Sequence, residues 1–413
     1  MREQEQEQEQ EQEHGHGTGR HGAGQYEAGE RGTVRSTHPI VKPALRRGWR
    51  DLSTVQFGVA PAHALVLGPM DTATSSFLTL LDGTRGLPLL REEARRMGLP
   101  DGHVDRLLSE LARAGLLDDT TGGGPAADAL RGRGEVMDRL RADVASLSLL
   151  SPEPGGAIAK IAARRAMRVR VQGAGRVGAV VASVLAGAGV GRVDVLDGGQ
   201  VQPWDVAPGG LPAESVGERR DTTARRVVRH SAPGRPPRQS EEPEQTEGFS
   251  LVIIAPRDGL DAYAPAPTAA EALLASGTPH LYAGVIEGTG VVGPLVLPGT
   301  TACAECLFRQ RADRDATWPR MLAQWRSGHQ RQAPACDLAL STSVAGLTAG
   351  HALAFLDGES SACTGVRWTA SVPGFEWRLS PIWPHPSCSC GAGVSVKGDR
   401  LTAGTKPHAT MAG

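Results

Sequence analysis

The sequence lacks three features that mark specialised classes of protein. Its 413 residues carry a formal net charge of −1, so no overall electrostatic field draws the chain to nucleic acid or to a membrane surface. No apolar run reaches the length of a membrane-spanning helix, and the polar N-terminus has no hydrophobic signal segment. We therefore expect a cytoplasmic protein with neither a nucleic-acid nor a membrane partner.

Cysteine is also scarce. The chain has six cysteines, and in the cytoplasm these are more often metal ligands or reactive thiols than disulfides. Four of them form two close pairs, Cys303-x-x-Cys306 and Cys388-x-Cys390. Four thiolates suit tetrahedral zinc, and a site with every position filled is structural. The alternative is a redox pair, but we expect neither pair to open a helix as a thioredoxin motif does. His385 is a possible alternate ligand that we expect to lie in a loop.

The most informative segment is VRVQGAGRVG at 169–178, a β-branched run that enters a glycine-rich turn. Gly173 permits the tight turn, Gly175 lets a phosphate approach the backbone, and Gly178 lets the next helix pack closely on the strand. That helix attracts an anion at its N-terminus. Asp197, which ends the next apolar run, can accept hydrogen bonds from ribose hydroxyls. The pattern predicts a nucleotide-binding βαβ unit; a turn rich in glycine for tight packing alone is the alternative.

Composition along the chain predicts five segments. Both ends are polar and low in complexity, so we expect them to be disordered. Between them we expect a small α+β domain, a glycine-rich linker and an α/β domain that carries the glycine turn. The segments are a disordered tail at 1–38, a winged-helix-like domain at 40–119, a linker at 120–135, a Rossmann-like domain at 136–393 and a disordered tail at 394–413.

The small domain is expected to hold a hairpin followed by helices. TVQFGV at 54–59 and HALVLG at 63–68 supply the two strands, and Asp71 can cap the first helix. This order suggests a winged-helix relative, for which DNA binding is one hypothesis. The last helix, however, carries acidic residues beside its arginines, and a helix that reads a DNA groove needs a basic face.

The larger domain shows a second set of apolar runs. We expect helices over 136–168 with a break at 151–156, and a loop over 231–248. Two buried strands, an antiparallel partner and a long apolar helix are then expected at 250–255, 280–287, 290–299 and 342–356.

The order of these features resembles the ThiF/MoeB/HesA superfamily, the bacterial relatives of ubiquitin-activating enzymes. The likeness runs over roughly 136–393, from the glycine turn through VGERR at 216–220 to the two cysteine pairs. It implies a Rossmann-like fold with a structural zinc, and an enzyme that adenylates the C-terminal carboxylate of a small carrier protein or peptide with ATP. The N-terminal domain is similar to leader-peptide-recognition modules of ribosomal peptide (RiPP) maturation, which implies a precursor peptide as partner.

The resemblance also assigns binding roles to individual residues. Asp197 falls where the family contacts the ribose, and Arg220 falls where the family usually has a lysine on the phosphates. An arginine there keeps the charge and gains a planar fork. The implied ATP-binding set is Gly173, Gly175, Gly178, Asp197 and Arg220, and the implied zinc ligands are Cys303, Cys306, Cys388 and Cys390.

Three residues become candidates for catalysis. Asp258 lies one position after Arg257, which stands where the family has an aspartate that holds magnesium. Cys336 falls where several members have a cysteine that forms covalent links, before a helix N-terminus that would stabilise its thiolate. Arg141, like Arg139, lies where the family's arginine helix reaches the ATP of the partner subunit in a homodimer; arginines on a solvated helix face are the alternative.

Other positions depart from the family pattern. Gly199 replaces a second aspartate, and Asp205 and Pro208 stand where the family has an asparagine and an arginine. These changes leave two hypotheses: an active adenylyltransferase, and a catalytically degenerate scaffold that presents a precursor peptide to a partner enzyme. A third, an NAD-dependent oxidoreductase, fits the glycine motif, but the two cysteine pairs are foreign to that class.

Overall fold

The computed structural model describes residues 37–235, 248–328 and 333–392. The expected disordered tails therefore lie almost wholly outside the described residues, as does most of the loop expected at 231–248.

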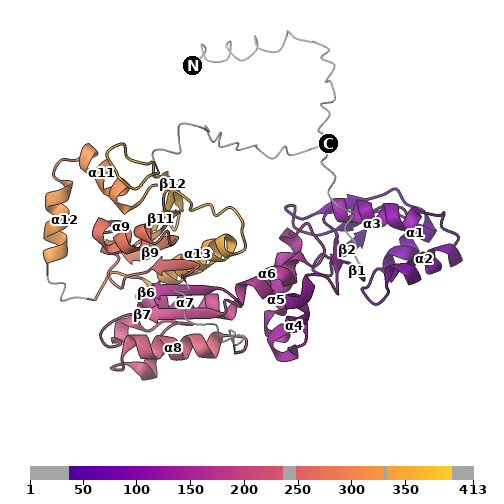
Figure 1. Cartoon of the computed structure of the whole chain (residues 1–413), viewed down its shortest axis with the longest axis horizontal. Helices are drawn as coiled ribbons and strands as arrows, with labels where there is room; N and C mark the ends of the chain where they lie inside the picture. The colour runs from indigo at the N-terminus through magenta and orange to yellow at the C-terminus, as the bar shows by residue number, and fades with distance from the viewer. Residues whose placement is uncertain (1–36, 236–247, 329–332, 393–413) are drawn as a thin grey trace, which may run out of the picture. The chain divides into compact units, whose positions relative to one another are not determined.

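Residues 39–119 form two small antiparallel sheets and a set of helices (Figure 1). The expected hairpin is confirmed, because β3 pairs with β4 with Gln56 opposite Val66. Asp71 caps α1, and its carboxylate accepts a hydrogen bond from the Thr74 N–H at 2.6 Å. The winged-helix assignment stays a prediction. The elements are β1 (Pro39–Val41), β2 (Arg47–Trp49), β3 (Val55–Phe57), β4 (Leu65–Leu67), α1 (Thr72–Phe77), η1 (Leu78–Leu80), α2 (Leu87–Arg96), α3 (His103–Arg113) and β5 (Leu117–Asp119), with the sheet orders β1-β5 and β2-β3-β4.

The segment 120–135, expected to be a linker, contains a helix. α4 (Gly124–Arg131) has a proline in its first turn and buries Ala127 and Leu130 in one cluster with α5 (Gly134–Leu150) and α6 (Gly156–Arg164). This packing stabilises a helix that the glycine-rich sequence does not indicate. The break expected at 151–156 does separate α5 from α6.

A mixed sheet of seven strands forms the larger part, in the order β12-β11-β10-β9-β8-β6-β7. β7, β6, β8 and β9 are parallel, and the remaining pairings are antiparallel. The strands expected at 169, 250–255, 280–287 and 290–299 are all present. Their bounds are β6 (Arg168–Gln172), β7 (Arg192–Leu196), β8 (Leu251–Ile254), β9 (His280–Ile286), β10 (Thr289–Val296), β11 (Val366–Ser371) and β12 (Arg378–Pro381).

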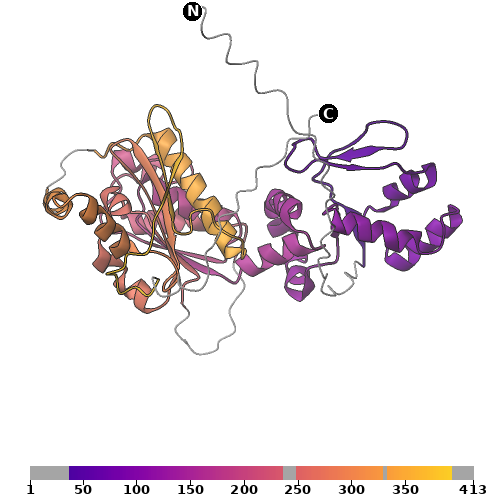
Figure 2. The same cartoon turned by 90° about the horizontal axis from the view of Figure 1, so that it is seen from above.

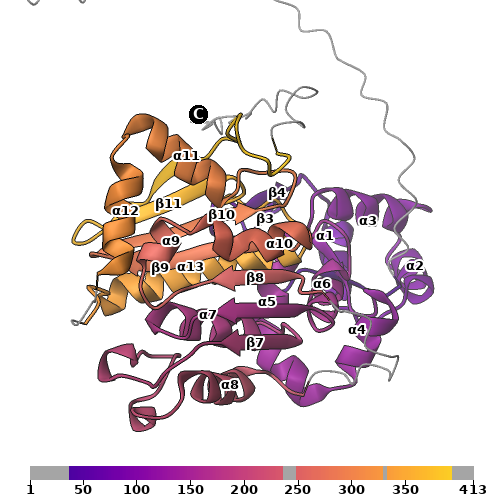
Figure 3. The same ribbon diagram turned by 60° about the vertical axis from the view of Figure 1, so that its left-hand side comes forward.

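Helices cover both faces of this sheet (Figure 2; Figure 3). Neighbouring strand residues point to opposite faces, so Ile253 and Leu281 join one core with α7 and α13, while Ile254 and Tyr282 join another with α10 and α11. The helices of the larger part include three 3-10 turns, labelled η. They are α7 (Arg176–Gly187), η2 (Pro203–Asp205), η3 (Ala213–Ser215), α8 (Arg220–Ser231), α9 (Leu260–Tyr263), η4 (Pro267–Ala270), α10 (Glu271–Ala275), α11 (Ala304–Arg314), α12 (Trp318–Ser327) and α13 (Leu338–Leu356).

Helix α13 differs from expectation in two ways. It begins at Leu338 rather than at 342, because the Asp337 carboxylate caps it by accepting from the Leu340 N–H at 3.0 Å. With 19 residues it is also long and apolar enough to cross a membrane by length and composition, so the expectation that no segment reaches this length is wrong. Core helices pass the same test, and Val344 and Ala349 are buried in the core that α13 shares with α7.

Candidate nucleotide site and metal centre

The glycine turn joins β6 to α7, and its three glycines are needed for different reasons. Gly173 has a φ of 106°, and a Cβ there would lie 1.9 Å from the Ala255 carbonyl oxygen. A Cβ on Gly178 would lie 2.1 Å from the carbonyl oxygen of Gly173, so this glycine permits the close approach of helix and turn. Gly175 is the N-cap of α7 and meets the side chain of Arg257 instead. The turn is therefore built as expected.

Asp197 lies at the end of β7 and is tied to the turn. One carboxylate oxygen accepts from the Ala174 N–H at 2.5 Å, and the other accepts from Arg220 Nε at 3.0 Å. Arg220, the first residue of α8, also donates to the carbonyl oxygens of Gly198 and Gln200. A Cβ on Gly199 would lie 3.0 Å from the Arg220 guanidinium. The glycine that replaces the family's second aspartate thus gives the guanidinium room.

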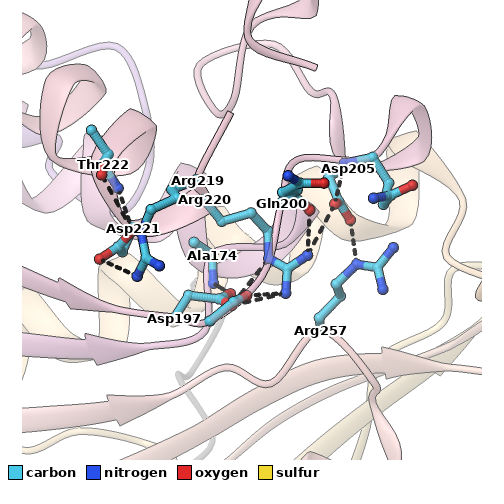
Figure 4. Close-up of polar contacts among 11 residues, drawn as sticks. Ala174, Asp197, Gln200, Asp205, Arg219, Arg220, Asp221, Thr222 and Arg257 are labelled. Atoms are coloured by element: carbon cyan, nitrogen blue, oxygen red, sulfur yellow. Dashed lines mark hydrogen bonds and ion pairs between the residues drawn. The ribbon is translucent and has the colours of Figure 1, made fainter. Parts of the chain in front are cut away.

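A second ion pair lies beside the first (Figure 4). The Asp205 side chain is only 2% exposed; it accepts from the Gln202 N–H at 2.9 Å and from Arg257 Nε at 2.5 Å. Arg220 Nη1 lies 3.7 Å from the same carboxylate. Two aspartates and two arginines therefore alternate along this edge of the sheet, and their formal charges cancel.

Asp197 and Arg257 are among the residues that line a cavity of about 330 Å³ at the carboxyl ends of β6, β7 and β8. Ligands of open α/β sheets bind at this edge, where the order of the strands reverses. The lining is mostly apolar apart from its charged rim. It comprises Gln172, Gly173, Leu196, Asp197, Ile254, Pro256, Arg257, Asp261, Pro265, Ala266, Ala269 and Tyr282.

The two cysteine pairs meet, as expected, in one cluster. All four sulfur atoms lie within 4.8 Å of one another, and the closest approaches are 3.6 Å, from Cys303 to Cys388 and from Cys306 to Cys390. Tetrahedral zinc with Zn–S bonds of about 2.3 Å requires sulfur atoms about 3.8 Å apart. The cluster therefore fits zinc, which would join the start of α11 to the C-terminal segment.

The neighbours of the cluster settle two further expectations. His385 lies in a loop, where its backbone N–H donates to Cys306 Sγ at 3.3 Å while its ring pairs with Asp313, so the ring is not a ligand. The hydrogen bond from Cys303 lowers the pKa of Cys306 to about 4. The expectation that neither pair opens a helix is wrong, because Cys303 is the N-cap of α11. The second pair beside it still favours a metal over a redox dithiol.

Cys336 does not have the environment expected of a thiolate nucleophile. Burial raises the pKa of its thiol, and the nearby Arg176 only partly opposes this. The helix that follows is capped by Asp337, and the Arg176 guanidinium donates to the Cys336 carbonyl oxygen at 2.8 Å rather than to the sulfur.

The other two catalytic candidates are not among the residues that line the cavity. Asp258 accepts from the Leu260 N–H at 3.0 Å and is not part of the lining. Arg141 is 80% exposed on α5 and pairs with Asp138 at 2.5 Å. Arg139 donates to the carbonyl oxygens of Ser231 and Ala232 at the end of α8, a structural role. Use of Arg141 in a partner subunit stays a prediction.

Two polar residues of the site were not singled out from the sequence. The Tyr282 hydroxyl at the cavity wall is buried, has no hydrogen-bond partner among the described residues, and has a pKa raised by burial. Arg367 on β11 is buried nearby, and this burial lowers its pKa to about 9. Tyr282 lies in an apolar strand run, where the sequence pattern indicates core positions only, and nothing in the sequence around Arg367 marks it as buried.

The sequence matches the ThiF family over residues 158–392, more than half of the chain. The chain belongs to the ThiF family. No curated protein matches it. Solved structures show the same fold at low identity. E. coli MccB with succinimide has a TM-score of 0.61 and 14% identity over 86% of this chain and 98% of that one, and ATP-bound MccB has 0.59 and 15% over 85% and 99%. PaaA has 0.58 and 16% over 83% and 100%.

Proposed function

We propose that this ThiF-family protein is an ATP-dependent adenylyltransferase that activates the C-terminal carboxylate of a peptide or small carrier protein. One observation carries the proposal: Asp197, which lines a cavity at the carboxyl ends of the parallel strands, is hydrogen-bonded both to the glycine turn and to Arg220. Similar structures of E. coli MccB contain ATP or the peptide MccA, which supports a nucleotide and a peptide as the two ligands.

In the proposed reaction, a carboxylate oxygen of the peptide attacks the α-phosphorus of ATP. A carboxyl–phosphate bond forms, the bond from the α-phosphorus to the bridging oxygen breaks, and pyrophosphate leaves. The N–H groups at the start of α7 and the guanidinium of Arg220 would stabilise the charge on the phosphates. Asp197 would orient the ribose while it holds Arg220 in place.

The family also implies magnesium, which the carboxylates at the glycine turn do not fit. Both oxygens of Asp197 and of Asp205 already accept hydrogen bonds from the protein. No catalytic step is therefore assigned to the metal. A role for Asp258 as its ligand stays a prediction, as do a homodimer and a cytoplasmic location.

Exchange of labelled pyrophosphate into ATP tests the proposal, with the full chain and, as acceptors, short peptides or small carrier proteins encoded near its gene. We expect exchange that depends on the peptide and falls about 10²-fold or more in Arg220→Gln, because one donor to the developing charge is lost. Arg225→Gln on the same helix removes an equal charge from an exposed side chain and is the matched control. Absence of peptide-dependent exchange would contradict adenylation.

The scaffold hypothesis is the second candidate. It is favoured by Pro208 in place of an arginine, and by the ion pair that occupies Arg257 and Asp205. A scaffold should form a tight complex with the peptide and show no pyrophosphate exchange at any peptide concentration. The same assay therefore separates the two candidates.

A further inference from the structure

The Asp197 carboxylate, which lines the cavity, and the Asp205 carboxylate, which pairs with the lining residue Arg257, both have partners inside the protein. Asp197, 8% exposed, and Asp205, 2% exposed, each accept one backbone N–H and one arginine N–H. A divalent cation at either carboxylate would have to share oxygens that already accept these hydrogen bonds, and it would lie beside an arginine of like charge. Displacing that arginine instead would break a buried ion pair, which is strongly unfavourable.

Asp261 is the second acidic residue of the lining. Its side chain is 57% exposed, and Arg326 Nε lies 3.7 Å from its carboxylate. Within the described part of the chain, Asp197 and Asp261 are the acidic residues of the lining. Magnesium prefers several oxygen ligands in regular geometry, and this wall does not offer them.

Arg257, by contrast, has an N–H group that donates to no residue in the described part of the chain. It follows β8 and lines the cavity, and its Cγ would lie 3.3 Å from a Cβ on Gly175, the point where a phosphate approaches the backbone. Its Nε donates to Asp205, whereas its Nη2 is buried and has no hydrogen-bond partner among the described residues. A buried N–H group that donates to nothing lowers the stability of the protein unless a ligand accepts its hydrogen bond.

We propose that Arg257, positioned by Asp205, binds the nucleotide phosphates together with Arg220, and that nucleotide binding by this protein requires no divalent cation. The inference rests on the proposed nucleotide site and adds to it. A guanidinium presents a planar fork of donors that matches two phosphate oxygens. Asp205 accepts from the Nε edge of the Arg257 fork and so fixes the guanidinium of a residue that lines the cavity.

Calorimetric titration of the full chain with AMPCPP tests this inference. Binding is compared in buffer with magnesium and in buffer cleared of divalent ions on a chelating resin before the protein is added, so that bound zinc is not removed. We expect wild-type affinities that agree within about threefold. Arg257→Gln should weaken binding about tenfold or more in both buffers, because a charged hydrogen-bond donor is lost. Arg225→Gln should leave it unchanged.

A second variant keeps the test informative if Arg257→Gln unfolds. This is the double variant Asp205→Asn/Arg257→Asp, which has a single carboxylate in place of the buried ion pair. We expect its binding of AMPCPP to require magnesium. Thermal melting checks the fold of each variant. A wild-type affinity that falls tenfold or more without magnesium would overturn the inference and leave the proposed function intact. No AMPCPP binding in either buffer would overturn both.

Discussion

At the scale of single residues, the nucleotide site depends on the identity of its glycines and on the pairing of its charges. The roles of the glycines could be predicted, because each follows from backbone geometry within a few positions of the chain. The Asp205–Arg257 pair could not, because the two residues are 52 positions apart and meet only through the fold. Both residues depart from the family pattern, but the sequence alone does not show that they pair with one another.

Gly175→Val is expected to prevent ATP binding without unfolding the protein. Gly175 has a φ of −77°, which valine can adopt, but its side chain would fill the space between the turn and Arg257. Calorimetry should show an affinity for ATP at least about tenfold weaker, with a melting temperature close to that of the wild type. Gly178→Ala is the structural counterpart and should cost about 1–3 kcal/mol of stability through overpacking. NADH binding in the absence of ATP binding would contradict the nucleotide assignment.

Cys336 is expected to react slowly with iodoacetamide near neutral pH. Burial raises the pKa of this thiol above its usual value, and only the thiolate is nucleophilic, so the rate should still be rising at a pH at which an ordinary cysteine is already fully ionised. Site-resolved mass spectrometry measures the rate at each cysteine. The same residue in urea-unfolded protein is the control and should react faster at every pH. Fast labelling of the folded protein at neutral pH would instead support a catalytic thiolate.

At the scale of secondary-structure elements, the sequence predicts a helix or strand correctly where several local signals occur close together. The Asp71 cap, the break between α5 and α6, and the strands of the larger sheet follow from capping, glycine and apolar patterns. Two elements were misjudged because tertiary packing determines them. α4 is stabilised by the burial of Ala127 and Leu130 against α6, and the extra turn of α13 depends on the Asp337 cap.

The cysteine cluster yields a prediction about elements, because zinc would join the start of α11 to the segment after β12. Purified protein should contain one zinc per chain. Cys306→Ser should lose the metal and lower the melting temperature by roughly 10 °C or more, since binding energy at a structural zinc site is folding energy. Cys336→Ser, which lies outside the cluster, is the matched control and should retain zinc. Elemental analysis that finds no zinc in the wild-type protein would contradict the assignment.

At the scale of the whole molecule, the chain combines the ThiF-family part with a small domain whose sheet has an open edge. β3 is paired on both sides, so β4 is the edge strand of the predicted hairpin, and Val66 on it is 52% exposed. An extended peptide can extend such an edge through main-chain hydrogen bonds. The domain division itself stays a prediction, but it assigns peptide capture and nucleotide chemistry to different parts of the chain.

Val66→Lys tests that division of labour in the full chain. A lysine on an edge strand hinders the addition of another strand while it leaves the pairing with β3 intact. The affinity for the peptide that supports pyrophosphate exchange should fall about tenfold or more, and the affinity for ATP should not change, because the substitution touches no residue of the cavity. Leu52→Ala, a fully exposed apolar residue between β2 and β3, is the control and should bind peptide normally. Loss of ATP affinity in Val66→Lys would show that the two functions are not separate, and unchanged peptide affinity would move the peptide site away from β4.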